Sequence, residues 1–226
     1  MKFTYYGHSC FAVETAGKIL LFDPFITPNE LAKAISLDQI KADYILISHG
    51  HFDHIADAVE LAQKTGATVI SNFEIVTWLG GKGVEKTHPM NHGGAFTFDF
   101  GRVKYVAAVH SSQLPDGSYG GNPGGFVVEN KEGAFFFAGD TALTLDFKLI
   151  GKEFDLRFAV LPIGDNFTMG AKDATLAADF LKCRKVVGVH YDTFPPIEID
   201  HGVAVKTFKS AGLKLLLPPI GGSLDL

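Results

Sequence analysis

Short apolar segments of strand length recur along the chain, and they restrict its fold more than any other feature of the sequence. Turn residues such as Gly, Pro, Asn and Asp separate them, as is typical of strands joined by loops. The segments span 2–6, 11–14, 18–22, 44–47, 67–70, 103–109, 125–129, 134–138 and 159–161.

Helical patterns lie between these segments, at 30–35, 56–65, 73–79, 171–182 and 202–211. The early segments predict antiparallel hairpins, whereas the later alternation of strand and helix predicts helices that cover sheet faces. We therefore predict an α/β fold of the layered sandwich type. No linker or internal repeat divides the 226 residues, so we expect one domain, 1–226.

Charge and composition narrow the classes of function. The net charge is -5, and the 20 Lys and Arg residues are scattered singly. This pattern disfavours a nucleic-acid partner without excluding one. No signal peptide or membrane-length apolar run is visible, so we expect a cytoplasmic protein without a membrane partner. The composition is also compatible with a homo-oligomer. Cys10 and Cys183 form no close-spaced pair and are expected to be buried.

The strongest local signal is the hexapeptide 49–54, His-Gly-His-Phe-Asp-His, which follows the apolar segment 44–47. Its imidazoles and carboxylate are metal-ligand types, and a turn from strand into helix lets such a group serve two adjacent ions. The alternative is a polar surface turn, but packing alone has no use for so many imidazoles.

Three further residues occupy similar positions, each just after an apolar strand: His110, Asp140 and His190. Taken singly, each is as easily a structural polar residue as a ligand. Strand ends on one side of an α/β sheet converge on a shared crevice, however, so all three can reach the hexapeptide.

The hexapeptide, His110, Gly-Asp-Thr at 139–141 and His190 together resemble the successive metal-binding motifs of the metallo-β-lactamase superfamily. Gly-His-Ser-Cys-Phe at 7–11, Leu-Phe-Asp-Pro at 21–24 and the stretch 163–170 resemble more narrowly the UPF0173 metal-dependent hydrolases, which are related to ascorbate-6-phosphate lactonase. The resemblance implies a four-layer αββα sandwich, with two mixed sheets flanked by helices.

The resemblance also implies a ligand set for two divalent metal ions. It assigns His49, His51 and His110 to one ion, Asp53, His54 and His190 to the other, and Asp140 as the bridge. Imidazole and carboxylate ligands suit Zn²⁺ or Mn²⁺, with Fe²⁺ or Ni²⁺ as alternatives. The set contains no cysteine, the ligand that would favour zinc strongly.

The predicted function is that of a metal-dependent hydrolase, in which a hydroxide bridging two ions attacks a small ester, lactone or phosphoester substrate. One alternative is a nuclease or phosphodiesterase of the same superfamily, acting on RNA or small phosphodiesters. Another is a non-hydrolytic metal-binding or di-iron redox module, although the chain lacks the C-x-x-C pairs of a rubredoxin partner.

Several neighbours have weaker functional predictions. We expect catalytic roles for Asp53 and for His8, which can protonate a leaving group or brace a ligand through its second nitrogen. The Gly-rich loop 113–125 is a candidate substrate loop. Residues expected to support the ligands or contact substrate are Asp23, His92, Asn166, Tyr191 and Asp192.

Overall fold

A computed structural model describes all 226 residues, and it contains two seven-stranded mixed sheets. The first sheet has the strand order β14-β1-β2-β3-β4-β5-β6, antiparallel from β14 to β3 and parallel from β3 to β6. Its strands are β1 (Lys2–Gly7), β2 (Cys10–Thr15), β3 (Lys18–Phe22), β4 (Tyr44–Leu46), β5 (Thr68–Asn72), β6 (Thr87–Met90) and β14 (Ser223–Asp225).

The second sheet repeats this arrangement in the order β13-β12-β11-β10-β9-β8-β7. It is parallel from β13 to β10 and antiparallel from β10 to β7. Its strands are β7 (Ala95–Phe98), β8 (Gly101–Ala107), β9 (Gly124–Asn130), β10 (Gly133–Phe137), β11 (Leu156–Pro162), β12 (Lys185–Val189) and β13 (Lys214–Leu216).

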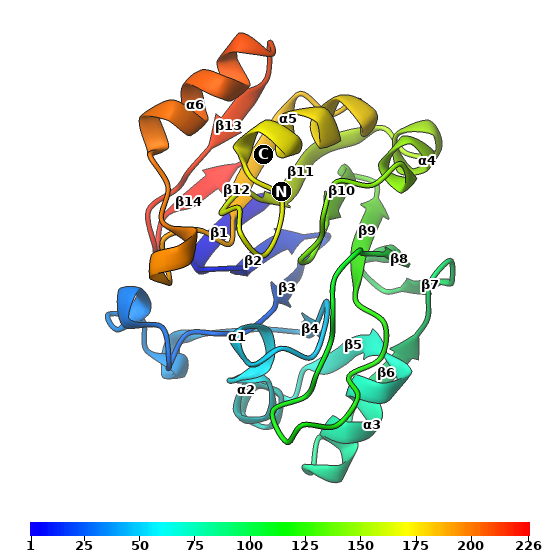
Figure 1. Cartoon of the computed structure of the whole chain (residues 1–226). Helices are drawn as coiled ribbons and strands as arrows, with labels where there is room; N and C mark the ends of the chain where they lie inside the picture. The colour runs from blue at the N-terminus through cyan, green and yellow to red at the C-terminus, as the bar shows by residue number, and fades with distance from the viewer.

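Helices cover the outer face of each sheet (Figure 1), which confirms the predicted four-layer sandwich. The first sheet carries α1 (Phe52–Ile55), α2 (Ala58–Thr65) and α3 (Phe73–Gly81), and the second carries α4 (Asp146–Glu153), α5 (Ala171–Phe180) and α6 (His201–Ser210). Short 3₁₀ turns span Glu30–Ala32, Leu37–Gln39 and Pro195–Ile197. No helix combines the length and the apolar character needed to cross a membrane.

An aromatic layer fills the space between the two sheets. Phe22 of β3 is fully buried, with its ring centroid 4.6 Å from Phe11 and 5.6 Å from Phe137 of the opposite sheet. Strand alternation places Phe135 and Phe137 in this layer, while Phe136 packs under the helices of the second sheet. The two sheets therefore share one apolar core that fixes how their edges meet.

The predicted elements differ from the structure mainly at the sheet margins. The expected helix 30–35 is a 3₁₀ turn, the expected helix 56–65 is α2 with the short α1 before it, and α4 was not expected. Gly151 lies inside α4, where a Cβ atom would stand 2.5 Å from the Phe180 carbonyl oxygen. Glycine weakens the helical signal there, but it permits close contact with the end of α5.

We expect Phe22→Ala to lower the free energy of unfolding by about 3–5 kcal/mol, because the cavity would open between two sheets that cannot close around it. Urea denaturation followed by circular dichroism measures this change. Phe96→Ala is the matched control, since Phe96 is 48% exposed and its loss should cost under about 1 kcal/mol. A cost below that level for Phe22→Ala would contradict its central role.

Candidate metal centre

The candidate centre lies at one edge of the sandwich, around α1 (Figure 1), where strands of both sheets end. β4 leads into the hexapeptide 49–54, and β10 leads into Asp140. His110 follows β8, and His190 follows β12 directly. The fold therefore brings the predicted ligands from both sheets into two adjoining groups.

The first group consists of His49, His51 and His110, which offer nitrogen atoms within 4.8 Å of one another. Nε2 of His49 lies 3.0 Å from Nδ1 of His51, and the His110 ring centroid is 5.1 Å from that of His49. His49 is buried, whereas the His110 side chain is 14% exposed. This group is thus open to solvent on one side only.

The second group consists of Asp53, His54, His190 and His8, again with donor atoms within 4.8 Å. Oδ2 of Asp53 lies 3.0 Å from Nε2 of His8, 3.8 Å from Nε2 of His54 and 3.9 Å from Nε2 of His190. His8 therefore reaches the centre itself, where the sequence had indicated a neighbouring role.

Asp140 lies between the two groups. Its Oδ2 atom is 2.9 Å from Nε2 of His190 and 3.3 Å from Nε2 of His54 in the second group. The same oxygen is 3.6 Å from Nε2 of His110 and 3.9 Å from Nε2 of His49 in the first. One buried carboxylate oxygen thus faces imidazoles of both groups.

Asp23 supports the centre from behind. Its carboxylate accepts hydrogen bonds from Nδ1 of His54 at 2.7 Å, from the Ser48 amide at 2.7 Å and from the Ser48 hydroxyl at 2.6 Å. Oγ of Ser48 lies 2.9 Å from Nδ1 of His49, so the contacts of Asp23 extend to both groups. Such contacts fix the orientation of each ring and leave Nε2 directed at the centre.

His8 is 1% exposed, and both of its ring nitrogens are occupied. Nδ1 lies 2.9 Å from Oγ1 of Thr193, and Nε2 is bonded to Asp53. Burial lowers the pKa of His8 to about 4, although the hydrogen bond to Asp53 opposes this shift. The geometry therefore fits a residue that braces Asp53 better than one that protonates a leaving group.

Burial keeps several of the imidazoles neutral. It lowers the pKa of His49 well below its usual value, and it also lowers the pKa values of His51 and His110. A neutral imidazole retains a lone pair on one nitrogen, which is the form that binds a metal ion.

The Asp140 carboxylate remains ionised although it is buried. Burial would raise the pKa of Asp140, but His190 and His54 lower it well below its usual value. Burial would likewise lower the pKa of His54, but Asp140 and Asp53 raise it well above its usual value. The carboxylates of Asp140 and Asp53 therefore stabilise a positive charge that lies between them, such as a bound cation.

The donor set fits divalent metal ions. Three buried atoms at the centre have no hydrogen-bond partner in the protein: Nε2 of His54, Oδ1 of Asp140 and Nδ1 of His190. A buried polar atom without a partner costs about 1–3 kcal/mol, which indicates that Nε2 of His54 and Oδ1 of Asp140 serve a ligand. His190 directs its other nitrogen, Nε2, at Asp140. Imidazole and carboxylate ligands suit Zn²⁺, Mn²⁺, Fe²⁺ and Ni²⁺, and both cysteines are buried outside these groups.

Four other predicted residues make no hydrogen bond to these groups. Nε2 of His92 lies 2.9 Å from the Pro123 carbonyl oxygen, and Asp192 is bonded to His201 at 2.6 Å. The Tyr191 ring is parallel to that of Tyr5 at 6.3 Å. Asn166 is exposed in the loop after β11.

The loop 113–125 is anchored beside the centre. The Ser112 hydroxyl accepts from the Gly50 amide at 3.0 Å and donates to the Gly120 carbonyl at 2.9 Å, while Asn72 donates to the same carbonyl at 2.8 Å. The loop thus supports the turn between His49 and His51. No local sequence pattern marks Ser48, Ser112 or Thr193, because their contacts join residues distant in the chain or depend on side-chain direction.

Comparisons with known proteins agree with this geometry. The family model described as the beta-lactamase superfamily domain matches residues 2–190. A UPF0173 metal-dependent hydrolase of Flavobacterium johnsoniae is 52% identical over 226 residues, covering 100% of both chains. Another from Christiangramia forsetii is 54% identical over 227 residues, again covering 100% of both.

Solved structures give the same result. Igni18, described as a novel metallo hydrolase from Ignicoccus hospitalis, superposes with a TM-score of 0.89 and 36% identity, over 100% of this chain and 98% of its own. An isothiocyanate hydrolase from Delia radicum gut bacteria has a TM-score of 0.77 over 100% and 99% of the two chains. Its identity is 17%, so this second likeness concerns the fold alone.

We expect Asp23→Asn to weaken divalent-metal affinity about 10–100-fold while the far-UV circular dichroism spectrum stays unchanged. The substitution removes the negative charge that orients His54 and Ser48. Competition with a chelating indicator measures the affinity. Asp99→Asn is the control, because it alters a surface carboxylate that is bonded to Tyr44. Equal affinities in the two variants would contradict the positioning role of Asp23.

Proposed function

The chain belongs to the metallo-β-lactamase superfamily and, within it, to the UPF0173 metal-dependent hydrolases, and from this membership we propose that it uses two divalent ions to hydrolyse a small ester, lactone or phosphoester. One observation carries the proposal of two ions. Oδ2 of Asp140 lies 2.9 Å from His190 in one donor group and 3.6 Å from His110 in the other. A carboxylate in that position can bind an ion on each side.

In this proposal the ligands divide as the two groups do. His49, His51 and His110 would hold one ion, Asp53, His54 and His190 would hold the other, and Asp140 would contact both. The chemistry that two bound ions supply is activation of water and polarisation of the substrate's carbonyl or phosphoryl oxygen. We propose Zn²⁺ or Mn²⁺ as the native metal, because the set combines imidazoles with carboxylates and has no thiolate.

The other roles follow from hydrogen bonds of the chain itself. Asp23 orients His54, and His8 holds Oδ2 of Asp53. The Asp53 side chain is 23% exposed. Burial would raise its pKa, but His54 and His8 hold the pKa far below the usual value, so its carboxylate stays ionised and can orient water at the open side of the centre. The substrate approaches from that exposed side, because His54 and His190 are buried.

Asp140→Asn tests the proposal most directly. We expect kcat to fall at least about 100-fold, more than the loss of an outer hydrogen-bond partner costs, because the amide cannot bridge two cations. Turnover of metal-reconstituted protein on a panel of lactones, esters, thioesters, phosphodiesters and short RNA measures this. Asp155→Asn, at an exposed carboxylate, is the control. Full activity in Asp140→Asn would refute the bridging role.

Metal stoichiometry tests the number of ions separately from turnover. After reconstitution and desalting, we expect about two equivalents per chain in the unaltered protein and about one in either His51→Ala or His190→Ala. Mass spectrometry of the released metal measures the content. His92→Ala should retain both ions, since His92 lies outside the donor groups. One equivalent in the unaltered protein would exclude a dinuclear centre.

A further inference from the structure

We infer that the natural substrate of this centre is uncharged away from its scissile bond and carries an apolar group of about the size of a phenyl ring. This group packs against an aromatic wall made by Phe25, Phe52 and Phe194. The inference rests on the proposed function and narrows it, because it favours carboxylic esters, lactones or thioesters with an apolar substituent over phosphorylated substrates.

The aromatic wall contacts the centre directly. The ring centroid of Phe25 lies 5.8 Å from that of Phe52 and 6.3 Å from that of Phe194. The His8 ring lies 5.5 Å from Phe25 and 5.6 Å from Phe194, and its Nε2 is bonded to Asp53. The wall thus adjoins the half of the centre that contains the partly exposed Asp53.

Two rings of the wall remain open to solvent. Phe52 is 54% exposed and Phe194 is 37% exposed, while Phe25 behind them is buried. The exposed area of a phenyl ring contributes little to folding, but it stabilises a bound apolar group by about 25 cal/mol for each Å² that both remove from water. Rings held at this position are therefore suited to contact the substrate.

Exposed apolar side chains also occur in the segments next to His110 and Asp140. Val109, Leu145 and Phe167 are each more than half exposed, at 54%, 67% and 54%. Thr141 joins two of their segments beside Asp140, because its hydroxyl accepts from the Val109 amide and its carbonyl accepts from the Met169 amide, both at 3.0 Å. The segments that carry Val109 and Phe167 are thus held together next to Asp140, and they add exposed apolar surface there.

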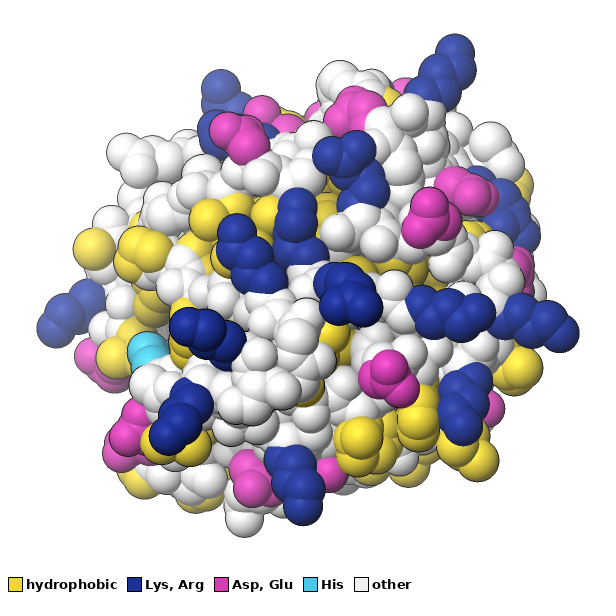
Figure 2. All heavy atoms as spheres, turned by 90° about the horizontal axis from the view of Figure 1, so that it is seen from above, with side chains coloured by type: hydrophobic (Ala, Val, Ile, Leu, Met, Phe, Trp, Pro, Cys, Tyr) yellow, Lys and Arg dark blue, Asp and Glu magenta, His cyan; other side chains and the backbone are white.

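The segments that build the centre contain no Lys or Arg. They span 7–10, 21–27, 47–57, 108–125, 138–142 and 189–194. Figure 2 shows Lys and Arg side chains spread over the face that carries α4, α5 and α6. The exposed basic residues of these helices and the turns after them include Lys148, Lys172, Lys182, Lys206 and Lys209.

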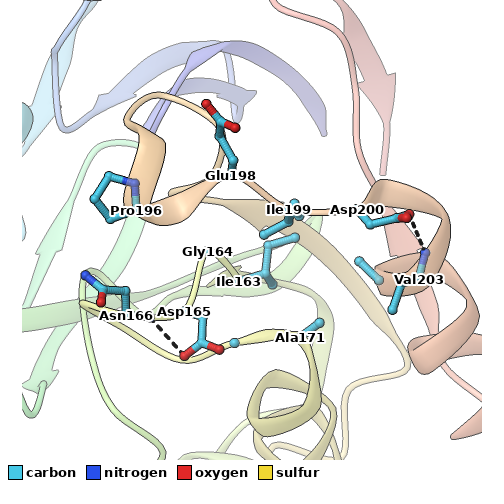
Figure 3. Close-up of a pocket in the computed structure, with 12 residues that line it drawn as sticks. Ile163, Gly164, Asp165, Asn166, Ala171, Pro196, Glu198, Ile199, Asp200 and Val203 are labelled. Atoms are coloured by element: carbon cyan, nitrogen blue, oxygen red, sulfur yellow. Dashed lines mark hydrogen bonds between the residues drawn. The ribbon is translucent and has the colours of Figure 1, made fainter.

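A cavity of about 320 Å³ that His8 itself lines contains the carboxylate of Asp192 and no Lys or Arg. A second cleft is acidic. It has a volume of about 500 Å³ and lies between the loop after β11 and the segment leading into α6 (Figure 3). Its charged lining residues are Asp165, Glu198 and Asp200. A phosphate group remote from the metal ions would thus meet carboxylates and no cation, which disfavours anionic substrates and RNA.

Matched substrates test the inference. We compare kcat/KM for a γ-lactone that is unsubstituted, one that carries a phenyl group and one that carries a phosphate on the same position. The phenyl lactone should exceed the unsubstituted one at least about tenfold, and the phosphorylated lactone should not exceed it. Phe52→Ala and Phe194→Ala should each reduce the phenyl preference about three- to tenfold, whereas Phe96→Ala should leave it unchanged.

Binding provides a readout independent of turnover. The probe is 4-phenyl-2-butanone, an uncharged ketone that cannot be hydrolysed, and saturation-transfer NMR detects its contact with the metal-loaded protein. We expect contact with the unaltered protein and the Phe96→Ala control, and a loss of at least about threefold in Phe194→Ala.

The outcomes separate the two proposals. Hydrolysis that favours the phosphorylated lactone, or that ignores Phe52 and Phe194, overturns the inference and leaves the hydrolase proposal intact. Ketone binding that depends on Phe194 without turnover of any substrate supports the apolar wall and overturns the hydrolase proposal. If Phe194→Ala leaves ketone binding unaffected but changes the oligomeric state measured by sedimentation, the exposed rings form an interface between two copies of the chain. That result overturns the inference.

Discussion

The contact between the two sheets at one edge is the constraint on which the rest of this structure depends. The amide of His190, after β12, donates to the carbonyl of His8 at 3.0 Å, and the amide of Gly124 at the start of β9 donates to the carbonyl of Ser48 at 3.0 Å. Tyr105 also donates to Ser48 at 2.9 Å. These bonds join strand ends of the first sheet to those of the second, so neither sheet alone can form the centre.

This edge also concentrates backbone strain. His8, Asp23 and His190 adopt left-handed conformations, with φ values of 53°, 40° and 57°. Such conformations cost about 1–3 kcal/mol each in residues other than glycine, and they persist only where the surrounding contacts enforce them. Gly139 has a φ of 62° for a related reason, since a Cβ there would stand 2.5 Å from the Gly124 carbonyl oxygen. The buried aromatic layer offsets the strain that directs these side chains inward.

The sequence predicted the interior of this fold better than its margins. The strands that were not expected, β6, β7, β13 and β14, are the edge strands of the two sheets. An edge strand is paired on one side only, so it tolerates Pro89 in β6 and shows little of the apolar pattern that marks a central strand. The inner strands, including the early hairpins and the aromatic segment 135–137, were predicted because burial leaves apolar runs in them.

Some residues of the centre could likewise be predicted from local sequence patterns, whereas others depend on contacts between distant parts of the chain. The hexapeptide and the residues after apolar strands were visible because ligand types at strand ends form a local pattern. The contact of His8 with Asp53 was not, since 45 positions separate the two residues. Residues that hold a metal ion must keep a fixed chemistry, whereas the loops that contact a substrate need only a suitable surface. The apolar character of that surface became apparent once the fold had placed Phe52 beside Phe25 and Phe194 beside His8.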